Sequence, residues 1–117
     1  MNAPNCIFCG ILEGRIPATI IAESSDAIMI RDLHPQAPLH YLVIPRKHIA
    51  SLNDLTATDR TVILPALFEM ADHYAHEAGF RTSGYRTVIN NQLEAGQSVF
   101  HLHIHILAGA LRGTFGS

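Results

Sequence analysis

Residues 101–107, His-Leu-His-Ile-His-Ile-Leu, alternate imidazole and aliphatic side chains. Successive side chains of a β-strand point to opposite faces, so this pattern predicts a strand with an aliphatic back and an imidazole front. His101, His103 and His105 would share that front. The chain is therefore expected to form a sheet with an apolar face and a histidine-bearing face.

Further runs of β-prone residues are separated by turn-forming residues. They lie at positions 19–23, 27–31, 40–44 and 85–90. Residues 6–13 have the apolar spacing of a short helix, which Gly14 and Pro17 end. The pattern is that of an α+β fold in one domain, residues 1–117.

A single long helix is predicted between Ala57 and Gly79, because apolar residues recur there every three to four positions. Thr56 or Thr58 could cap its start. Pro65 removes a hydrogen bond to the preceding turn, so a kink or a broken first turn is expected there.

The same helix carries few charges. Glu69 is the one charged residue between positions 62 and 71, so the helix is expected to be buried on two sides. A second subunit would cover the side that the sheet leaves free.

Composition excludes several partners. Hydrophobic residues make up 48% of the 117 residues and charged residues 15%, which suits a compact domain. A formal net charge of −2 argues against binding to nucleic acid, which needs clustered basic residues. No apolar run approaches the roughly 20 residues that span a bilayer, and no charged-then-apolar leader opens the chain. A cytoplasmic protein without a membrane partner is expected.

The middle histidine of the row, His103, is the predicted nucleophile. A neutral imidazole near pH 7 is nucleophilic and basic, and its phosphorus adduct stays reactive toward water. Alternate strand positions lie about 6.5 to 7 Å apart, so His101 and His105 could donate to phosphate oxygens beside it. Two other interpretations stay open here: a histidine-rich strand that faces solvent, and a catalytic zinc bound by two strand histidines.

The histidine row resembles the signature of the histidine triad (HIT) superfamily, and the resemblance covers residues 5–109. Further motifs resemble its Hint (histidine triad nucleotide-binding) branch: Cys6-Ile7-Phe8-Cys9, Gly14-Arg15-Ile16-Pro17-Ala18, Pro35-Gln36-Ala37-Pro38, Leu42-Val43-Ile44-Pro45-Arg46-Lys47-His48-Ile49 and Gly96-Gln97-Ser98-Val99-Phe100. The resemblance implies a HIT-like fold: a five-stranded antiparallel sheet with one long and one short helix, paired into a ten-stranded sheet in a homodimer.

The same resemblance implies an activity. Members hydrolyse purine nucleoside 5′-phosphoramidates and related acyl or aminoacyl adenylates through a nucleotidyl-histidine intermediate, which would form here on His103. No cofactor takes part in that catalysis. His40 and His105 match the supporting histidines, and Ser98 matches a residue that contacts the phosphate or the leaving group.

The nucleotide would be a purine nucleotide resembling AMP. Asp32 matches the acid that accepts bonds from both ribose hydroxyls, and Asn90 and Gln97 would assist Ser98 at the phosphate. The matching nucleobase pocket is apolar and consists of Ile7, Phe8, Ile11, Ile30, Leu33 and Leu42. Simpler interpretations compete: core packing for the apolar residues, an Asx-type turn for Asp32, and a strand start or a turn for Ser98 and Asn90.

The two cysteines, Cys6 and Cys9, have a spacing common in zinc sites, and a tetrahedral site needs two more ligands. By resemblance those ligands are His48 and His101. The zinc would be structural and remote from catalysis. The competing interpretation is a pair of reduced thiols that pack as small hydrophobic side chains.

Two features of the sequence concern specificity. The chain has no tryptophan, whereas Hint members often carry one in a longer C-terminal tail than residues 110–117. The third histidine, His105, speaks against the nucleotidyltransferase branch, which has glutamine there. A dinucleoside polyphosphate hydrolase and a nucleotide-sensing or scaffold dimer with vestigial activity are the alternative functions.

Overall fold

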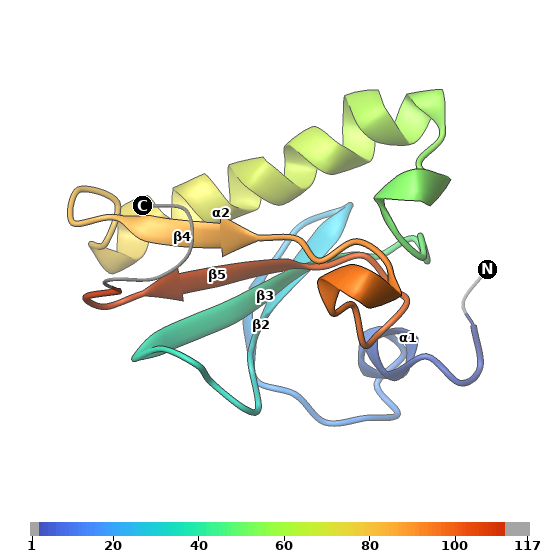
Figure 1. Cartoon of the computed structure of the whole chain (residues 1–117), viewed down its shortest axis with the longest axis horizontal. Coiled ribbons are helices and arrows are strands. Elements are labelled where there is room, and N and C mark those ends of the chain that lie inside the picture. The colour runs from blue at the N-terminus through green and yellow to red at the C-terminus, as the bar shows by residue number, and fades with distance from the viewer. Residues whose placement is uncertain (1–2, 112–117) are drawn as a thin grey trace.

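The computed structural model describes residues 3–111, which form an α+β fold around one antiparallel sheet. The five strands have the spatial order β1-β2-β3-β5-β4. Their bounds are β1 (Ile20–Glu23), β2 (Ala27–Arg31), β3 (Leu39–Pro45), β4 (Tyr85–Val88) and β5 (Ile104–Ala108). Two α-helices, α1 (Ile7–Leu12) and α2 (Leu64–Ala78), and short 3₁₀ helices at Leu52–Asp54 and Leu93–Ala95 complete the fold. Figure 1 shows α2 lying along the sheet.

The sheet separates two hydrophobic cores because its side chains alternate between faces. Met29, Val43 and Ile104 pack on the α2 side, where Leu67 of the helix joins them. The intervening residues of β2 and β3 pack on the other side, against Phe8 and Ile11 of α1. The histidine-bearing side of the sheet is therefore the side that α1 partly covers.

The predicted strand at 101–107 begins only at Ile104, so the prediction of a strand through His101 is wrong. The backbone N–H of Leu102 donates to the carbonyl of Ile49 at 2.7 Å, which draws this segment to the loop after β3. Leu102 is nevertheless buried in the same core as Ile104 and Ile106, so the predicted alternation holds. The other predicted strands lie within two residues of the observed ones.

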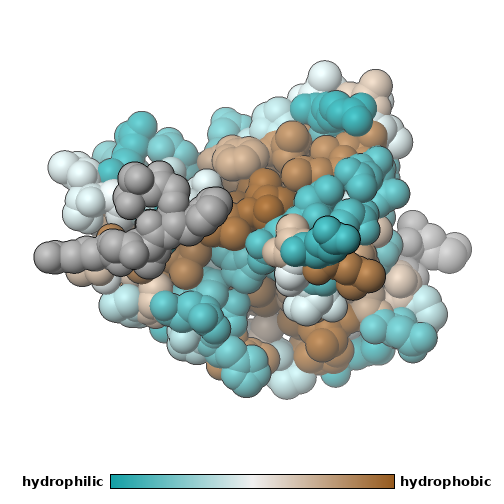
Figure 2. All heavy atoms as spheres, in the orientation of Figure 1, coloured by the Kyte–Doolittle hydropathy of each residue, from teal (hydrophilic) through white to brown (hydrophobic). Residues whose placement is uncertain are grey.

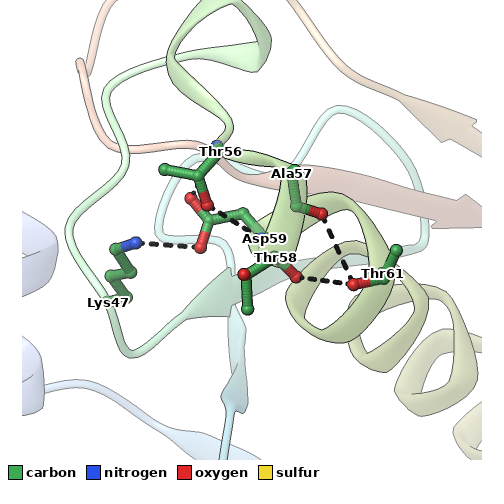
Figure 3. Close-up of polar contacts among 6 residues, drawn as sticks. All are labelled: Lys47, Thr56, Ala57, Thr58, Asp59 and Thr61. Atoms are coloured by element: carbon green, nitrogen blue, oxygen red, sulfur yellow. Dashed lines mark hydrogen bonds and ion pairs between the residues drawn. The ribbon is translucent and has the colours of Figure 1, made fainter.

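The long helical segment begins with a reciprocal cap, which Figure 3 shows. Thr56 Oγ1 accepts the backbone N–H of Asp59 at 3.0 Å, and Asp59 Oδ2 accepts that of Thr56 at 3.0 Å. Asp59 Oδ1 also accepts Lys47 Nζ at 2.8 Å, which holds its pKa below the ordinary value. Thr56 is thus the cap, whereas Thr58 makes no side-chain capping bond.

Pro65 lies in the first turn of α2, directly after a π-helical turn, Asp59–Ile63. In that turn the Leu64 N–H donates to the Asp59 carbonyl, five residues back. The irregular start that the sequence predicts is this π-helical turn.

Apolar side chains remain on the surface of this helical segment. Val62 is 48% exposed and Phe68 is 42% exposed, although Leu67 and Ala71 are buried against the sheet. Figure 2 shows hydrophobic side chains gathered over the region of α2 and β4. Within residues 3–111, no helix has the length and apolarity needed to cross a membrane.

Candidate active site

A cavity of about 310 Å³ lies on the α1 side of the sheet. Its lining comes from α1, from β2 and the loop after it, from β3, from the β4–β5 loop and from β5. It includes the six apolar residues predicted for a nucleobase, together with Asp32, Asn90, Ser98, His103 and His105. The fold therefore gathers most of the predicted site around one opening.

The apolar wall of this cavity has a buried part and an exposed part. Phe8, Ile11 and Leu42 are at most 7% exposed, and core packing alone accounts for their burial. Ile7 is 52% exposed and Leu33 is 75% exposed. Large aliphatic side chains at the rim of a cavity gain contact when a flat apolar ligand enters, so these two residues favour the binding interpretation.

His103 has one ring nitrogen fixed by the main chain. Its Nδ1 lies 2.8 Å from the carbonyl oxygen of His101, so Nδ1–H donates to that oxygen. Burial lowers the pKa of His103, and the neutral ring then carries its lone pair on Nε2. The ring also contacts the Phe8 ring edge-on, with centroids 5.1 Å apart. A buried neutral imidazole with a fixed tautomer is suited to nucleophilic attack.

The hydrogen bonds of His40 fix the tautomer of His105. The backbone N–H of Gln36 donates to His40 Nδ1 at 2.9 Å, so neutral His40 carries its proton on Nε2. That Nε2 lies 2.9 Å from His105 Nδ1 and donates to it. Neutral His105 consequently carries its own proton on Nε2. His105 can therefore offer a hydrogen-bond donor to a phosphate oxygen.

Burial keeps these two histidines neutral. The pKa of His105 is lowered to about 4, mainly by burial and also by the neighbouring His103 and His40, against the opposing charge of Asp32. Burial also lowers the pKa of His40, against the opposing charge of Asp32. At neutral pH, both rings are therefore neutral and each carries one proton.

The contacts of Asp32 show the Asx-type turn and leave its carboxylate at the cavity. Its Oδ1 accepts the backbone N–H of His34 at 2.8 Å, which is an Asx-type turn. Its Oδ2 lies 3.3 Å from His40 Nε2. The carboxylate still lines the cavity and keeps free lone pairs on each oxygen, so the turn orients it without removing it as an acceptor.

A second cavity of about 450 Å³ adjoins the first through shared residues. Asp32, His34, Asn90 and His105 line both cavities. The second cavity also reaches His40 and the strands β4 and β5. A ligand with its phosphate beside His105 can thus extend in two directions.

Gln97, which the sequence predicts to assist Ser98 at the phosphate, lines neither cavity. Its side chain is buried, and its Nε2 donates to the carbonyls of Ala50 at 2.7 Å and Val99 at 3.1 Å. Its Oε1 accepts the backbone N–H of Gln92 at 2.8 Å. Gln97 therefore holds the loop that presents the exposed residue Ser98 to the cavity.

The predicted metal ligands Cys6, Cys9, His48 and His101 form one cluster, whose ligand atoms lie within 4.8 Å of one another. Cys6 Sγ and Cys9 Sγ lie 3.3 and 3.6 Å from His101 Nδ1. His48 Nδ1 lies 3.3 Å from Cys9 Sγ and 3.2 Å from His101 Nδ1. Ligand atoms around a tetrahedral zinc ion are separated by about 3.5 Å, so the spacing fits.

The hydrogen bonds of His101 also suit a metal. Its Nε2 lies 2.8 Å from the carbonyl of Pro45 and donates to it, which leaves the Nδ1 lone pair directed at the cluster. Burial lowers the pKa of His101 to about 4, so the ring is neutral. Burial raises the pKa of the Cys9 thiol, so an ion that bound here would displace a proton from it.

This cluster adjoins the histidine row, to which His101 itself belongs. His101 provides Nδ1 to the cluster, and its carbonyl oxygen accepts Nδ1–H of His103. The Phe8 ring contacts the rings of His101 and His103, with centroids 5.8 and 5.1 Å apart.

Ligand atoms of Asp32, His40 and His105 also lie within 4.8 Å of one another. Here the hydrogen bonds oppose a metal. The Gln36 N–H occupies the lone pair of His40 Nδ1, so Nε2 carries a proton and has no lone pair to give. The contacts of His101 and His103 argue against a catalytic zinc bound by both rings, since their Nδ1 atoms face different partners.

Sequence reasoning missed two contributors to the site. His34 lines both cavities, and the Gln36 amide directs His40. A main-chain group leaves no signal in residue type, whereas the position of His34, two residues after Asp32, was a usable hint. His73 and His76 lie exposed on α2.

A further cavity of about 670 Å³ lies elsewhere, between the β1–β2 turn and α2. It contains none of the predicted site residues. It is an open depression lined by exposed charged side chains such as Glu23 and Asp72, and the chemistry described above does not involve it.

Comparisons with known proteins agree with this geometry. The model of the HIT domain family matches residues 13–111. An uncharacterised HIT-like protein from Chlamydia muridarum is 45% identical over 92% of this chain and 84% of the relative.

Solved structures are equally similar. A HIT family hydrolase from Legionella pneumophila is 41% identical, with a TM-score of 0.89 over 96% of this chain and 98% of that one. A histidine triad protein from Clostridium difficile is 38% identical, with a TM-score of 0.93 over 98% and 99%.

Proposed function

Because the chain belongs to the HIT domain family, we propose that it hydrolyses purine nucleoside 5′-phosphoramidates or acyl and aminoacyl adenylates at the α-phosphorus. The observation that carries the proposal is the arrangement of His103. A neutral ring with Nδ1–H tied to the His101 carbonyl lines a cavity that also has an apolar wall and a carboxylate. The ring suits a nucleophile, the apolar wall suits a nucleobase, and the carboxylate suits the hydroxyl groups of a ribose.

In the proposed reaction, His103 Nε2 bonds to the α-phosphorus as the bond from phosphorus to the leaving nitrogen or oxygen breaks. His105 Nε2–H donates a hydrogen bond to a phosphate oxygen, and a leaving amine takes its proton from solvent water. Water then attacks the phosphorus, the bond to His103 breaks, and the nucleoside monophosphate is released as the attacking water gives up a proton to the solvent. Ser98 and Asn90 would contact the phosphate, and Asp32 the ribose.

Turnover of adenosine 5′-phosphoramidate tests this mechanism. His103→Ala should abolish turnover, and mass spectrometry of a wild-type reaction quenched with denaturant at alkaline pH should find an adenylyl group on His103. His76→Ala is the matched control, because His76 lies exposed on α2 away from the cavity. Unchanged turnover in His103→Ala would contradict the proposal.

The same assay separates the alternatives. Faster hydrolysis of diadenosine polyphosphates than of the phosphoramidate would favour a dinucleoside polyphosphate hydrolase. AMP binding without turnover of any substrate would favour a nucleotide-sensing or scaffold dimer.

We further propose that the Cys6–Cys9–His48–His101 cluster binds structural Zn²⁺, as the spacing and the neutral His101 favour. Zinc there would supply cross-linking, because hydrogen bonds direct His103 and His105 away from the cluster. Catalysis would need no metal, so turnover should not require an added cation. Two free thiols suit a reducing compartment, which favours the cytoplasm.

A homodimer with a ten-stranded sheet is proposed on two observations. β4 is an edge strand that pairs with β5 alone among the described strands, so its other edge is open. Exposed Val62 and Phe68 offer apolar surface on the helical segment. A second copy paired at β4 would extend the sheet and cover part of that surface.

A further inference from the structure

We propose that metal binding by the Cys6–Cys9–His48–His101 cluster sets the geometry of the nucleotide cavity, by tying α1 to the segment that carries His103. The cysteines and His48 would then be positioning residues for nucleotide binding. The inference deepens the proposed function and rests on it where the nucleotide is concerned.

The helix that forms the cavity wall is too short to be stable alone. α1 has six residues, and isolated helices below about 12 to 15 residues are marginal in water. It nevertheless supplies Ile7, Phe8 and Ile11 to the cavity. Its position therefore depends on what holds it against the sheet.

Two kinds of contact hold α1. Phe8 and Ile11 pack in the smaller core, and Cys6 and Cys9 reach the cluster from the start of the helix. Cys6 also caps α1, because its Sγ accepts the Cys9 N–H at 3.4 Å. A metal ion would cross-link this helix start to His48, after β3, and to His101, before β5.

The hydrogen bonds among the four side chains of the cluster are weak. His101 Nδ1 is an acceptor, because Nε2–H donates to Pro45, and both sulfur atoms and His48 Nδ1 converge on it. Thiol groups are weak donors. An ion that accepts all four lone pairs replaces these contacts with strong directional bonds.

A single residue, His101, connects the cluster to the nucleophile His103. His101 contributes Nδ1 to the cluster and its carbonyl oxygen to His103. Phe8, between the two cysteines, contacts both rings. An ion that fixes His101 and α1 therefore fixes the acceptor that orients His103 and the ring beside it.

Pre-ordering of a binding site raises affinity, because a ligand binds only the competent fraction of molecules. If that fraction is about one tenth in the metal-free chain, the apparent Kd for AMP rises about tenfold. The effect needs no contact between metal and nucleotide.

The test compares wild-type protein loaded with one equivalent of Zn²⁺ with chelator-treated protein, under reductant throughout. Zn²⁺ should slow amide hydrogen exchange in Ile7–Leu12 and shift the His103 Nδ1–H resonance. Titration with AMP should give a Kd about tenfold lower in the loaded protein.

Two variants remove single ligands. Cys6→Ser preserves the helix cap, since serine is a good N-cap residue, and removes one sulfur ligand. His48→Asn removes one imidazole, and His76→Asn is its matched control. The first two should lose zinc and resemble chelated wild type in exchange and AMP affinity, whereas His76→Asn should resemble loaded wild type.

The outcomes are distinguishable. Failure of wild type to bind Zn²⁺, or equal α1 exchange and equal AMP affinity with and without it, would overturn the inference. A zinc-dependent change in α1 and His103 with no AMP binding in any sample would support the coupling and contradict the nucleotide-binding function.

Discussion

Main-chain groups make the three histidines of the row chemically different. His101 keeps Nδ1 for the cluster, His103 keeps Nε2 as its free nitrogen, and His105 keeps Nε2–H as a donor. The sequence predicts that these residues lie together, because alternation and motif spacing are visible in it. It does not predict their tautomers, since these depend on the carbonyls of Pro45 and His101 and on the Gln36 amide.

The lowered pKa values predict an unusual pH profile. The pKa of His105 is lowered from 6.5 to about 4, and burial also lowers that of His103, so both rings stay neutral at pH 6.5. The acid limb of kcat/KM for adenosine 5′-phosphoramidate should therefore lie below pH 6.5, the ordinary value for a histidine. The rate of the uncatalysed reaction is subtracted at each pH. A limb centred on pH 6.5 would show ordinary, solvated imidazoles.

Gln97 and Ser98 should respond differently to removal of their polar groups. Gln97→Ala removes three hydrogen bonds in a buried loop, so the free energy of unfolding should fall by about 1 to 3 kcal/mol. Ser98→Ala should change it by less than about 0.5 kcal/mol and lower kcat/KM. Urea unfolding and phosphoramidate kinetics measure both. Equal stabilities would contradict the structural role of Gln97.

The bounds of a strand or helix were predictable where neighbouring residues determine them. They were not predictable where a residue distant in the sequence does. Strand β2 matches its apolar run, because turns bound that run on both sides. The β5 strand starts at Ile104 and not His101, because the Leu102 N–H has a partner at Ile49 that sequence reasoning did not see. The helical segment was foreseen together with its irregularity, since Pro65 acts locally.

The start of that helical segment gives a sharp test. Thr56→Ala removes the hydroxyl that accepts the Asp59 N–H, so the free energy of unfolding should fall by about 1 kcal/mol. Thr58→Ala is the matched control and should be nearly neutral, because Thr58 makes no capping bond. Urea unfolding compares the two, and a larger loss in Thr58→Ala would show that the helix begins elsewhere.

The whole molecule leaves a strand edge and apolar surface uncovered. The sequence predicts a helix that is apolar on two sides. In the structure one side packs on the sheet, and Val62 and Phe68 remain about half exposed. The remaining tail, residues 112–117, lies outside the described residues, so its missing tryptophan gains no structural account.

The proposed dimer predicts the effect of a charge at this surface. Phe68→Glu places a carboxylate where an apolar contact would form, so the mass from light scattering should fall from that of a dimer to that of a monomer. Phe68→Leu keeps the surface apolar and should remain dimeric. A monomeric wild type, or a dimeric Phe68→Glu, would contradict the proposed assembly.

The Gln36 amide has a consequence for how the site tolerates mutation. Because an N–H of the main chain holds His40 Nδ1, nineteen of the twenty amino acids at position 36 supply the same donor, and proline alone withholds it. Side-chain diversity at this position is thus compatible with a constant protonation pattern around His105. A designer who transplants the histidines to another scaffold must copy the course of the backbone as well as the side chains.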